Sequence, residues 1–236
     1  VYFFSDFCSS LLLHKVRHCP LTMVLSKSFS SEPADKRQFT EDFDRAYSRW
    51  AGWYDTLVKV LPFWRTWLQA TIPHLQGPKV LEVSFGTGWL LTQIAGQFDS
   101  YGLDYNLRMC DIAKENLQRK RLSAEVIQGT VEAMPYENEF FDSVVSTMAF
   151  SGYPDADKAM AEMQRVLKPE GRLIVLDINF PREEGYVGMG LARLWQSSGD
   201  LLRDMDALFQ RQNLDYTDEE VGGFGTVHLY IAQKRR

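Results

Sequence analysis

The chain has 236 residues, 45% of them hydrophobic, which is enough to bury one substantial core, so a single domain is expected. Its net charge of −5 argues against a nucleic-acid binder that works by broad phosphate neutralisation. The three cysteines (Cys8, Cys19 and Cys110) lack CxxC spacing, which argues against a disulfide scaffold or a zinc site and fits a reducing compartment.

The N-terminal residues 1–37 differ in composition from the rest of the chain. Residues 1–31 hold a single acid, Asp6, together with several serines and a few basic side chains, and the first methionine is Met23. This bias is typical of an organellar transit peptide. Translation upstream of Met23 and a disordered tail are the alternatives. We predict a leader or disordered tail here, and a cytoplasmic protein, or a mitochondrial or plastid one if the segment is a transit peptide.

Residues 38–78 are predicted to form an N-terminal helical cover. Apolar side chains recur at helical spacing over Phe39–Val60. Pro62 interrupts this pattern and starts a second predicted helix over Phe63–Leu75.

The run Lys79–Leu90 combines an apolar strand, an acid and two closely spaced glycines before a helix. Glycine allows a ligand to approach the backbone directly, often at positive φ. A dinucleotide fingerprint needs a third glycine, but Leu91 occupies that position. Glu82 before the turn repels phosphate and suits a ligand with a cationic or amino group. An ordinary strand–helix turn with incidental glycines is the alternative.

Strands and amphipathic helices then alternate, which predicts a parallel sheet covered on both faces. After the strand Val80–Phe85, the predicted elements are a helix over Trp89–Phe98, a strand over Ser100–Leu103, a helix over Leu107–Arg119, a strand over Ala124–Gln128, a strand over Ser143–Met148, a helix over Ala156–Leu167, a turn over Lys168–Gly171 and a strand over Arg172–Leu176.

The C-terminal part is predicted to hold a long helix and an antiparallel hairpin. Apolar residues between Leu191 and Phe209 indicate the helix, and Gly222-Gly223 separates the two hairpin strands. The predicted fold class is α/β: a Rossmann-like, seven-stranded, mostly parallel sheet with a C-terminal antiparallel hairpin, helices on both faces and an N-terminal helical cover. Residues 79–236 form the core, in one domain with the cover.

A second acid, Asp104, ends the second predicted strand and faces the crevice where doubly wound sheets bind ligands. A carboxylate there accepts hydrogen bonds from both hydroxyls of a ribose. Tyr105 and Met109 supply flat and polarizable surface for a base. The alternative is that Asp104 caps the helix that begins near Leu107.

Four segments carry a family resemblance: "VLEVSFGTG", "GLDYNLRMCDIAKENL", "VIQGTVEAMPYENEFFDSVV" and "EMQRVLKPEGRLIVLD". In order and spacing they resemble class I S-adenosylmethionine-dependent methyltransferases of the ubiquinone/menaquinone-biosynthesis and phospholipid N-methyltransferase-like branch (methyltransferase type 11 domain). The resemblance covers about residues 45–178. It implies transfer of a methyl group from S-adenosyl-L-methionine, which leaves S-adenosyl-L-homocysteine, to a small lipophilic or lipid-like acceptor such as a quinone precursor or an amine head group. A catalytically silent S-adenosylmethionine-binding partner subunit is the alternative.

The resemblance also implies site residues. The expected cofactor-binding residues are Glu82, Ser84, Gly86, Thr87, Gly88, Asp104, Tyr105, Met109, Thr130, Val131 and Met148. Ser84 stands where the family motif has its first glycine. Thr130 stands where the family often has an acid that faces the adenine amine, so the Thr130 hydroxyl and the Val131 amide are expected to substitute. Residues 148–150 are expected to border the methyl group and the acceptor, with core packing as the alternative.

Tyr47 and Tyr54 resemble a tyrosine signature of this branch and are the candidate catalytic residues, in an acceptor-positioning role. Their spacing of seven puts them on one helix face, which is also typical of core aromatics. His74, His228 and Tyr153 are further candidates for proton removal, with His228 more typical of a structural residue.

The expected partner is a small-molecule acceptor, with no nucleic acid, no metal and an undetermined oligomeric state. An aromatic cluster in the cover suggests peripheral contact with a membrane surface, or packing onto the domain. Its members are Trp50, Trp53, Phe63, Trp64 and Trp67.

Overall fold

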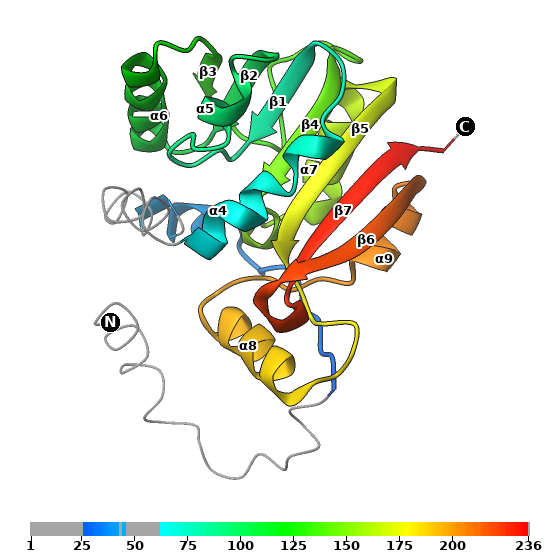
Figure 1. Cartoon of the computed structure of the whole chain (residues 1–236). Coiled ribbons are helices and arrows are strands. Elements are labelled where there is room, and N and C mark those ends of the chain that lie inside the picture. Colours follow the sequence, from blue (N-terminus) through cyan, green and yellow to red (C-terminus); the bar gives the residue numbers. More distant parts are fainter. Residues whose placement is uncertain (1–25, 43, 46–61, 236) are drawn as a thin grey trace.

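A computed structural model describes residues 26–42, 44–45 and 62–235. These residues build a seven-stranded sheet in the order β3-β2-β1-β4-β5-β7-β6 (Figure 1). The strands are β1 (Lys79–Val83), β2 (Asp99–Asp104), β3 (Glu125–Gln128), β4 (Phe141–Thr147), β5 (Leu167–Ile178), β6 (Leu214–Gly222) and β7 (Val227–Lys234). The helices are α4 (Pro62–Gln69), α5 (Leu91–Ile94), α6 (Leu107–Lys120), α7 (Ala156–Val166), α8 (Tyr186–Ser197) and α9 (Met205–Arg211).

Strands β1 to β5 are parallel, whereas β7 pairs antiparallel with β5 and β6. Glu82 on β1 is in register with Gly102 on β2 and Val145 on β4. The chain reverses between β6 and β7 at Gly223, whose φ of +61° suits a residue without a Cβ. The predicted fold class, a mostly parallel sheet with a C-terminal antiparallel hairpin, is confirmed.

Alternate residues of the central strands enter two separate cores, as expected for a sheet covered on both faces. Val144 and Val175 pack with α7 and α9 on one face. Val145 and Ile174 pack on the other face with residues from α4, α5 and α8. A third cluster joins α5 to α6.

Two sequence predictions about local structure are wrong. The predicted turn Lys168–Gly171 lies inside β5, which begins at Leu167 and accommodates the extra residues through a register irregularity opposite β4. The predicted long helix is two helices, α8 and α9, because the chain breaks after Ser198 at Gly199, whose φ is +109°. The predicted helix Trp89–Phe98 exists, with its α-helical part limited to α5.

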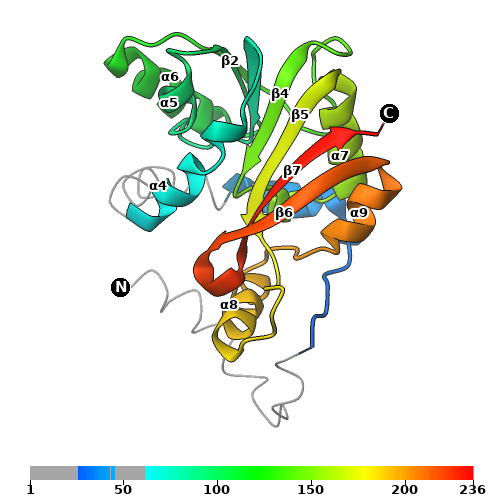
Figure 2. The ribbon, with the colours of Figure 1, turned by 45° about the vertical axis from the view of Figure 1, so that its right-hand side comes forward.

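The helical residues 36–42 and helix α4 lie at the carboxyl ends of the parallel strands, where the arrowheads of β1 and β5 point (Figures 1 and 2). Residues 36–42 and 44–45 are helical, in line with the start of the predicted helix Phe39–Val60, and its remainder lies outside the described residues. The second predicted cover helix is α4 followed by a single helical turn at Ile72–His74.

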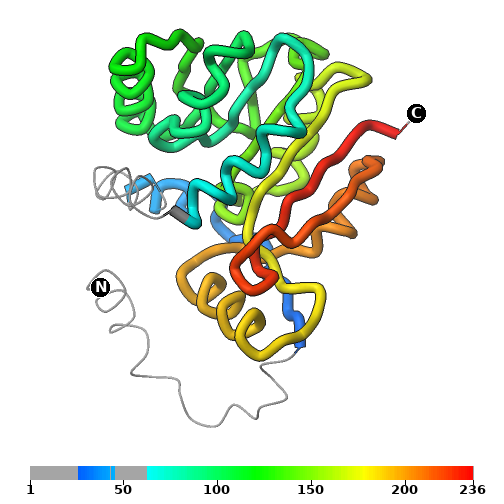
Figure 3. The backbone as a smooth tube through the Cα atoms, viewed as in Figure 1, coloured from blue at the N-terminus to red at the C-terminus, as the bar shows by residue number. Residues whose placement is uncertain are grey.

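Residues 26–35 run beside α8 before this helical segment (Figure 3). The backbone carbonyls of Ser26 and Ser28 accept hydrogen bonds from Arg193 and Gln196 on α8, and the Ser30 amide donates to Leu202 O at 2.7 Å. The proposed boundary at residue 37 stays a prediction. Within the described part of the chain, no helix has the length and apolar character needed to cross a bilayer.

Candidate functional site

A cavity of about 430 Å³ lies at the carboxyl ends of β1, β2 and β4, the usual ligand position in a doubly wound sheet. It collects most of the residues that the sequence singles out. The predicted cofactor-binding residues that line it are Glu82, Ser84, Gly86, Thr87, Asp104, Tyr105, Met109, Thr130, Val131 and Met148.

The turn after β1 is held in left-handed backbone conformations, which glycine adopts without strain. The φ angles are +51° at Ser84, +56° at Gly86 and +72° at Gly88. Gly88 is the predicted residue that does not line the cavity. A Cβ there would lie 2.7 Å from the Cβ of Ala113, so this glycine allows α6 to pack against the turn.

Glu82 is almost fully buried at the end of β1, with 1% of its surface exposed. Its Oε1 accepts a long hydrogen bond of 3.4 Å from Thr147, and its Oε2 has no hydrogen-bond partner among the described residues. Burial raises the pKa of Glu82 to about 8. A buried carboxyl oxygen without a partner is costly, so this position favours a ligand that brings a cation or a donor.

Asp104 connects the glycine turn to the start of α6. Its Oδ2 accepts a hydrogen bond from the Gly86 amide at 2.8 Å, and its Oδ1 accepts one from the Asn106 amide at 2.9 Å. The helix cap is Asn106, which accepts from the Met109 amide, so the alternative role of Asp104 as a cap is wrong. Burial raises the pKa of Asp104 to about 6 although both hydrogen bonds lower it. Asp104 lines the cavity and keeps further lone pairs as hydrogen-bond acceptors.

The surfaces expected to hold a base differ in exposure. Tyr105 is 46% exposed at the rim, whereas Met109 and Val131 are buried. The Thr130 hydroxyl accepts a hydrogen bond of 3.3 Å from the Glu132 amide and keeps its own proton for another acceptor.

The segment after β4 divides between cavity and core. Met148 lines the cavity with a φ of +52°, a strained conformation for a residue with a side chain, and Ala149 lines it too. Phe150 is buried in the core instead. The border role therefore stays a prediction for Met148 and Ala149, and Phe150 packs in the core as the alternative expected.

The sequence reasoning missed two cavity residues, Asp200 and Asp44, and did not place a third, Tyr153, beside Ser84. The Tyr153 hydroxyl, named only as a candidate base, lies between Ser146, at 3.1 Å, and Ser84, to which it donates at 3.0 Å. Asp200 enters the cavity from the break between α8 and α9. Asp44 lines it from the N-terminal helical segment and accepts a hydrogen bond from Asn106 at 2.8 Å. Gly199, a helix breaker, was the available sequence signal for the position of Asp200.

The two candidate catalytic tyrosines, Tyr47 and Tyr54, lie outside the described residues, as do Trp50 and Trp53. On α4, Trp64 lines the cavity. Trp67 packs instead against Gly222 of β6, where an added Cβ would lie 2.0 Å from its indole nitrogen.

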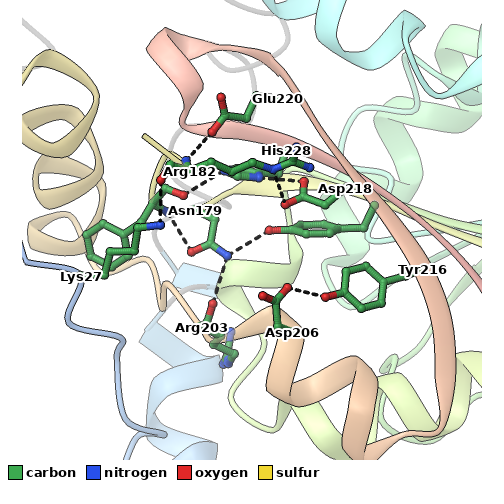
Figure 4. A network of polar contacts seen from close by, with 11 residues as sticks. Lys27, Asn179, Arg182, Arg203, Asp206, Tyr216, Asp218, Glu220 and His228 are labelled. Carbon is green, nitrogen blue, oxygen red and sulfur yellow. Dashed lines mark hydrogen bonds and ion pairs between the residues drawn. The ribbon is translucent and has the colours of Figure 1, made fainter. Parts of the chain in front are cut away.

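His228 lies in a hydrogen-bonded network on the C-terminal hairpin, outside the lining of the cavity (Figure 4). Its Nδ1 lies 2.9 Å from Asp218 Oδ1, and its Nε2 lies 3.0 Å from the carbonyl oxygen of Phe180. Both ring nitrogens have hydrogen-bond partners, which fits a structural role for His228. His74 ends the single helical turn before β1 and is half-buried. The described ranges contain no cluster of residues suited to a metal ion.

The fold and the site together define the class. The sheet order, the antiparallel β7 and the turn flanked by carboxyl groups are those of a class I, Rossmann-like methyltransferase. The two carboxyl groups fit S-adenosylmethionine, because Glu82 Oε2 has no partner among the described residues and Asp104 accepts a hydrogen bond from the glycine turn.

Comparisons with known proteins agree. Residues 81–175 match the family described as "Methyltransferase domain". The demethylmenaquinone methyltransferase of Thermotoga maritima is 30% identical over 152 residues, which cover 61% of this chain and 65% of the relative. A ubiquinone/menaquinone biosynthesis C-methyltransferase of Francisella tularensis is 34% identical over 139 residues, which cover 54% of this chain and 56% of the relative. The chain thus spans less than two thirds of either relative's length.

A crystal structure of a SAM-dependent methyltransferase from Thermotoga maritima shares the fold, with a TM-score of 0.65 and 21% identity over 81% of this chain and 99% of that one. Residues 81–175 therefore carry a methyltransferase domain, and the fold is the one seen in the SAM-dependent methyltransferase of Thermotoga maritima.

Proposed function

We propose that the protein is a methyltransferase that transfers a methyl group from S-adenosylmethionine to a ring carbon of a quinone precursor. The observation that carries the proposal is the buried carboxyl oxygen of Glu82, without a partner among the described residues, beside the glycine turn. S-adenosylmethionine supplies a methyl group already activated by its sulfonium. The quinone class is taken from the two relatives named above, whose names describe methyltransferases of quinone biosynthesis.

The residues of this chain have two tasks in such a reaction. Glu82 would bind the α-ammonium group, the turn at Gly86 would approach the amino-acid portion, and Asp104 would bind the ribose hydroxyls. Alignment and exclusion of water then carry most of the rate, since proximity effects are worth on the order of 7–11 kcal/mol in well-aligned systems. The apolar side chains of Trp64, Leu68 and Met148 in the cavity support a flat, lipophilic acceptor.

Calorimetry and turnover assays together test the proposal. S-adenosylhomocysteine should bind with a stoichiometry of one, and a demethylated naphthoquinol with a short alkyl chain should be methylated. Binding without turnover of any quinol or amine acceptor would favour the silent partner subunit. Absence of binding would reject both functions.

We also propose that the protein reaches a lipophilic acceptor at a membrane surface through α4. On this helix Phe63 is 47% exposed, one residue before the cavity-lining Trp64. Vesicle co-sedimentation should detect binding by the wild type and weaker binding by Phe63→Ser. Wild-type protein that stays in the supernatant would reject this contact.

A further inference from the structure

The cavity contains a carboxyl group that the proposed binding of S-adenosylmethionine does not use, that of Asp200. Across the sheet order, Asp104 follows β2, Glu82 belongs to β1, and Met148 follows β4. Asp200 comes from the segment after β5 and α8 and is hydrogen-bonded to Ser151, which follows β4, whereas the two acids assigned to S-adenosylmethionine lie on β1 and β2. It therefore belongs to the part of the cavity left for the acceptor.

The break between α8 and α9 holds Asp200 in place. Its amide donates to Trp195 O at 3.3 Å, and the neighbouring Leu201 amide donates to Ser151 O at 2.8 Å. The Ser151 hydroxyl donates to Asp200 Oδ1 at 3.1 Å, and the Ser198 hydroxyl, which donates to Trp195 O at 2.7 Å, lies 3.3 Å from Oδ2. The carboxyl group is thus fixed to the segment after β4, which forms the acceptor wall.

Among the described residues, no lysine, arginine or histidine forms an ion pair with Asp200. Arg203, three residues later, donates to the backbone carbonyls of Phe150, Leu201 and Tyr153 instead. Asp177 of β5 is a like charge that acts on Asp200, and it is held by the amides of Ser151 and Ile178. Asp200 is therefore a half-buried carboxyl group that keeps lone pairs free for a donor.

We propose that Asp200 is the catalytic base, which accepts the proton of a phenolic hydroxyl on the acceptor. The inference rests on the proposed function, because only a hydroxylated aromatic acceptor supplies that proton. Burial and the charge of Asp177 raise the pKa of Asp200 to about 6, so the group is mostly ionised at neutral pH yet more basic than an ordinary aspartate.

The step is balanced without an oxidant. Asp200 takes the hydroxyl proton, and the electron pair of the O–H bond enters the ring. The ring carbon ortho to that hydroxyl bonds to the methyl carbon, and the pair of the broken S–C bond stays on sulfur. The methylated carbon then loses its proton to solvent, and Asp200 returns the first proton to the oxygen. One proton is released for each methyl group transferred.

The test compares Asp200→Asn with the wild type and with Asp206→Asn, a matched control that replaces an exposed acid on α9. With 2-prenyl-1,4-naphthohydroquinone kept reduced under argon, we expect Asp200→Asn to lower kcat by about 100-fold or more. The acid limb near pH 6 in the pH–rate profile should disappear. The affinity for S-adenosylhomocysteine should stay within about twofold, and the control should behave as the wild type.

Other ionisable side chains also line the cavity, which is why the limb must be assigned through the variant. They are Arg37, Glu41, Asp44, Glu82, Asp104 and Glu132.

A second readout needs no turnover. In the presence of S-adenosylhomocysteine, the wild type should bind the naphthohydroquinone at least about fivefold more tightly than its dimethyl ether, because only the diol donates to Asp200. Asp200→Ala should lose this preference. Retained turnover in Asp200→Asn and a retained preference in Asp200→Ala would overturn the proposal. A wild type that binds S-adenosylhomocysteine but methylates no quinol would overturn the quinol function and this inference together.

Discussion

Two parts of the same sheet, the ligand end at β1 and β2 and the hairpin end at β6 and β7, hold acids in opposite situations. On the C-terminal hairpin, Asp218 lies 2.9 Å from His228 and 3.4 Å from Arg182, so its charge is paired within the chain (Figure 4). At β1 and β2, Glu82 and Asp104 form no ion pair with a described residue, and burial raises the pKa of both. Buried charges are normally paired. The contrast indicates that Asp218 stabilises the fold. Glu82 and Asp104 instead suit a ligand that brings positive charge and hydroxyl donors.

The largest expected effect on the ligand end comes from Gly86→Val. Gly86 lines the cavity in a left-handed backbone conformation that strains a β-branched residue, and the added side chain would compete with the ligand, so binding of S-adenosylhomocysteine should fall below detection. Calorimetry measures this. Gly190→Val on α8, where nothing lies within 4 Å of an added Cβ, is the control and should bind normally.

Removal of the Asp104 carboxyl group should reduce ligand binding less than Gly86→Val does. Asp104→Ala should lower the affinity for S-adenosylmethionine by about 1–3 kcal/mol, the range for lost hydrogen bonds to a charged group. Equilibrium dialysis with labelled ligand measures the dissociation constant. An unchanged value would contradict the ribose-binding assignment.

Glu82→Gln should make the protein without ligand more stable above neutral pH. The folded-state pKa of about 8 lies above the unfolded value of 4.5, so between these values the folded state holds a proton that the unfolded chain has released. The wild type therefore loses stability as pH rises through this window. At pH 8 the variant should gain about 1–3 kcal/mol in urea unfolding. At pH 4.5 the two proteins should be equal, and a variant less stable at pH 8 would refute the account.

The smallest effect on ligand binding is expected at the hairpin end, at β6 and β7. Asp218→Asn removes the charge partner of His228 and Arg182, which should lower the free energy of unfolding by about 1–3 kcal/mol. The affinity for S-adenosylhomocysteine should change by less than about twofold, since additivity holds for distant sites. A loss of affinity comparable to that of Asp104→Ala would erase the distinction between the two ends.

Much of the fold could be predicted from the sequence because strand and helix periods alternate over Lys79–Leu176 with little interruption. The long C-terminal helix was wrong because the apolar spacing continues across Gly199, and this spacing was followed although glycine breaks helices. The turn at Lys168–Gly171 was wrong because a register irregularity depends on the partner strand β4.

The acid-flanked turn of the site could be predicted for a similar reason, since Glu82, Gly86 and Asp104 belong to short local patterns. Tyr153 and Asp200 could not be assigned, because their positions depend on contacts with Ser84 and Ser151, 69 and 49 residues away.

The central claim is that Glu82 receives a cationic group from the ligand. Calorimetric titration of the wild type with S-adenosylhomocysteine at pH 7, in buffers of different ionisation enthalpy, counts the protons exchanged on binding. A group with a pKa of about 8 in the protein without ligand, driven to its ionised form by an ammonium group, should release close to one proton per ligand, and Glu82→Gln should abolish this release. Binding without proton release, or no binding, would contradict the account.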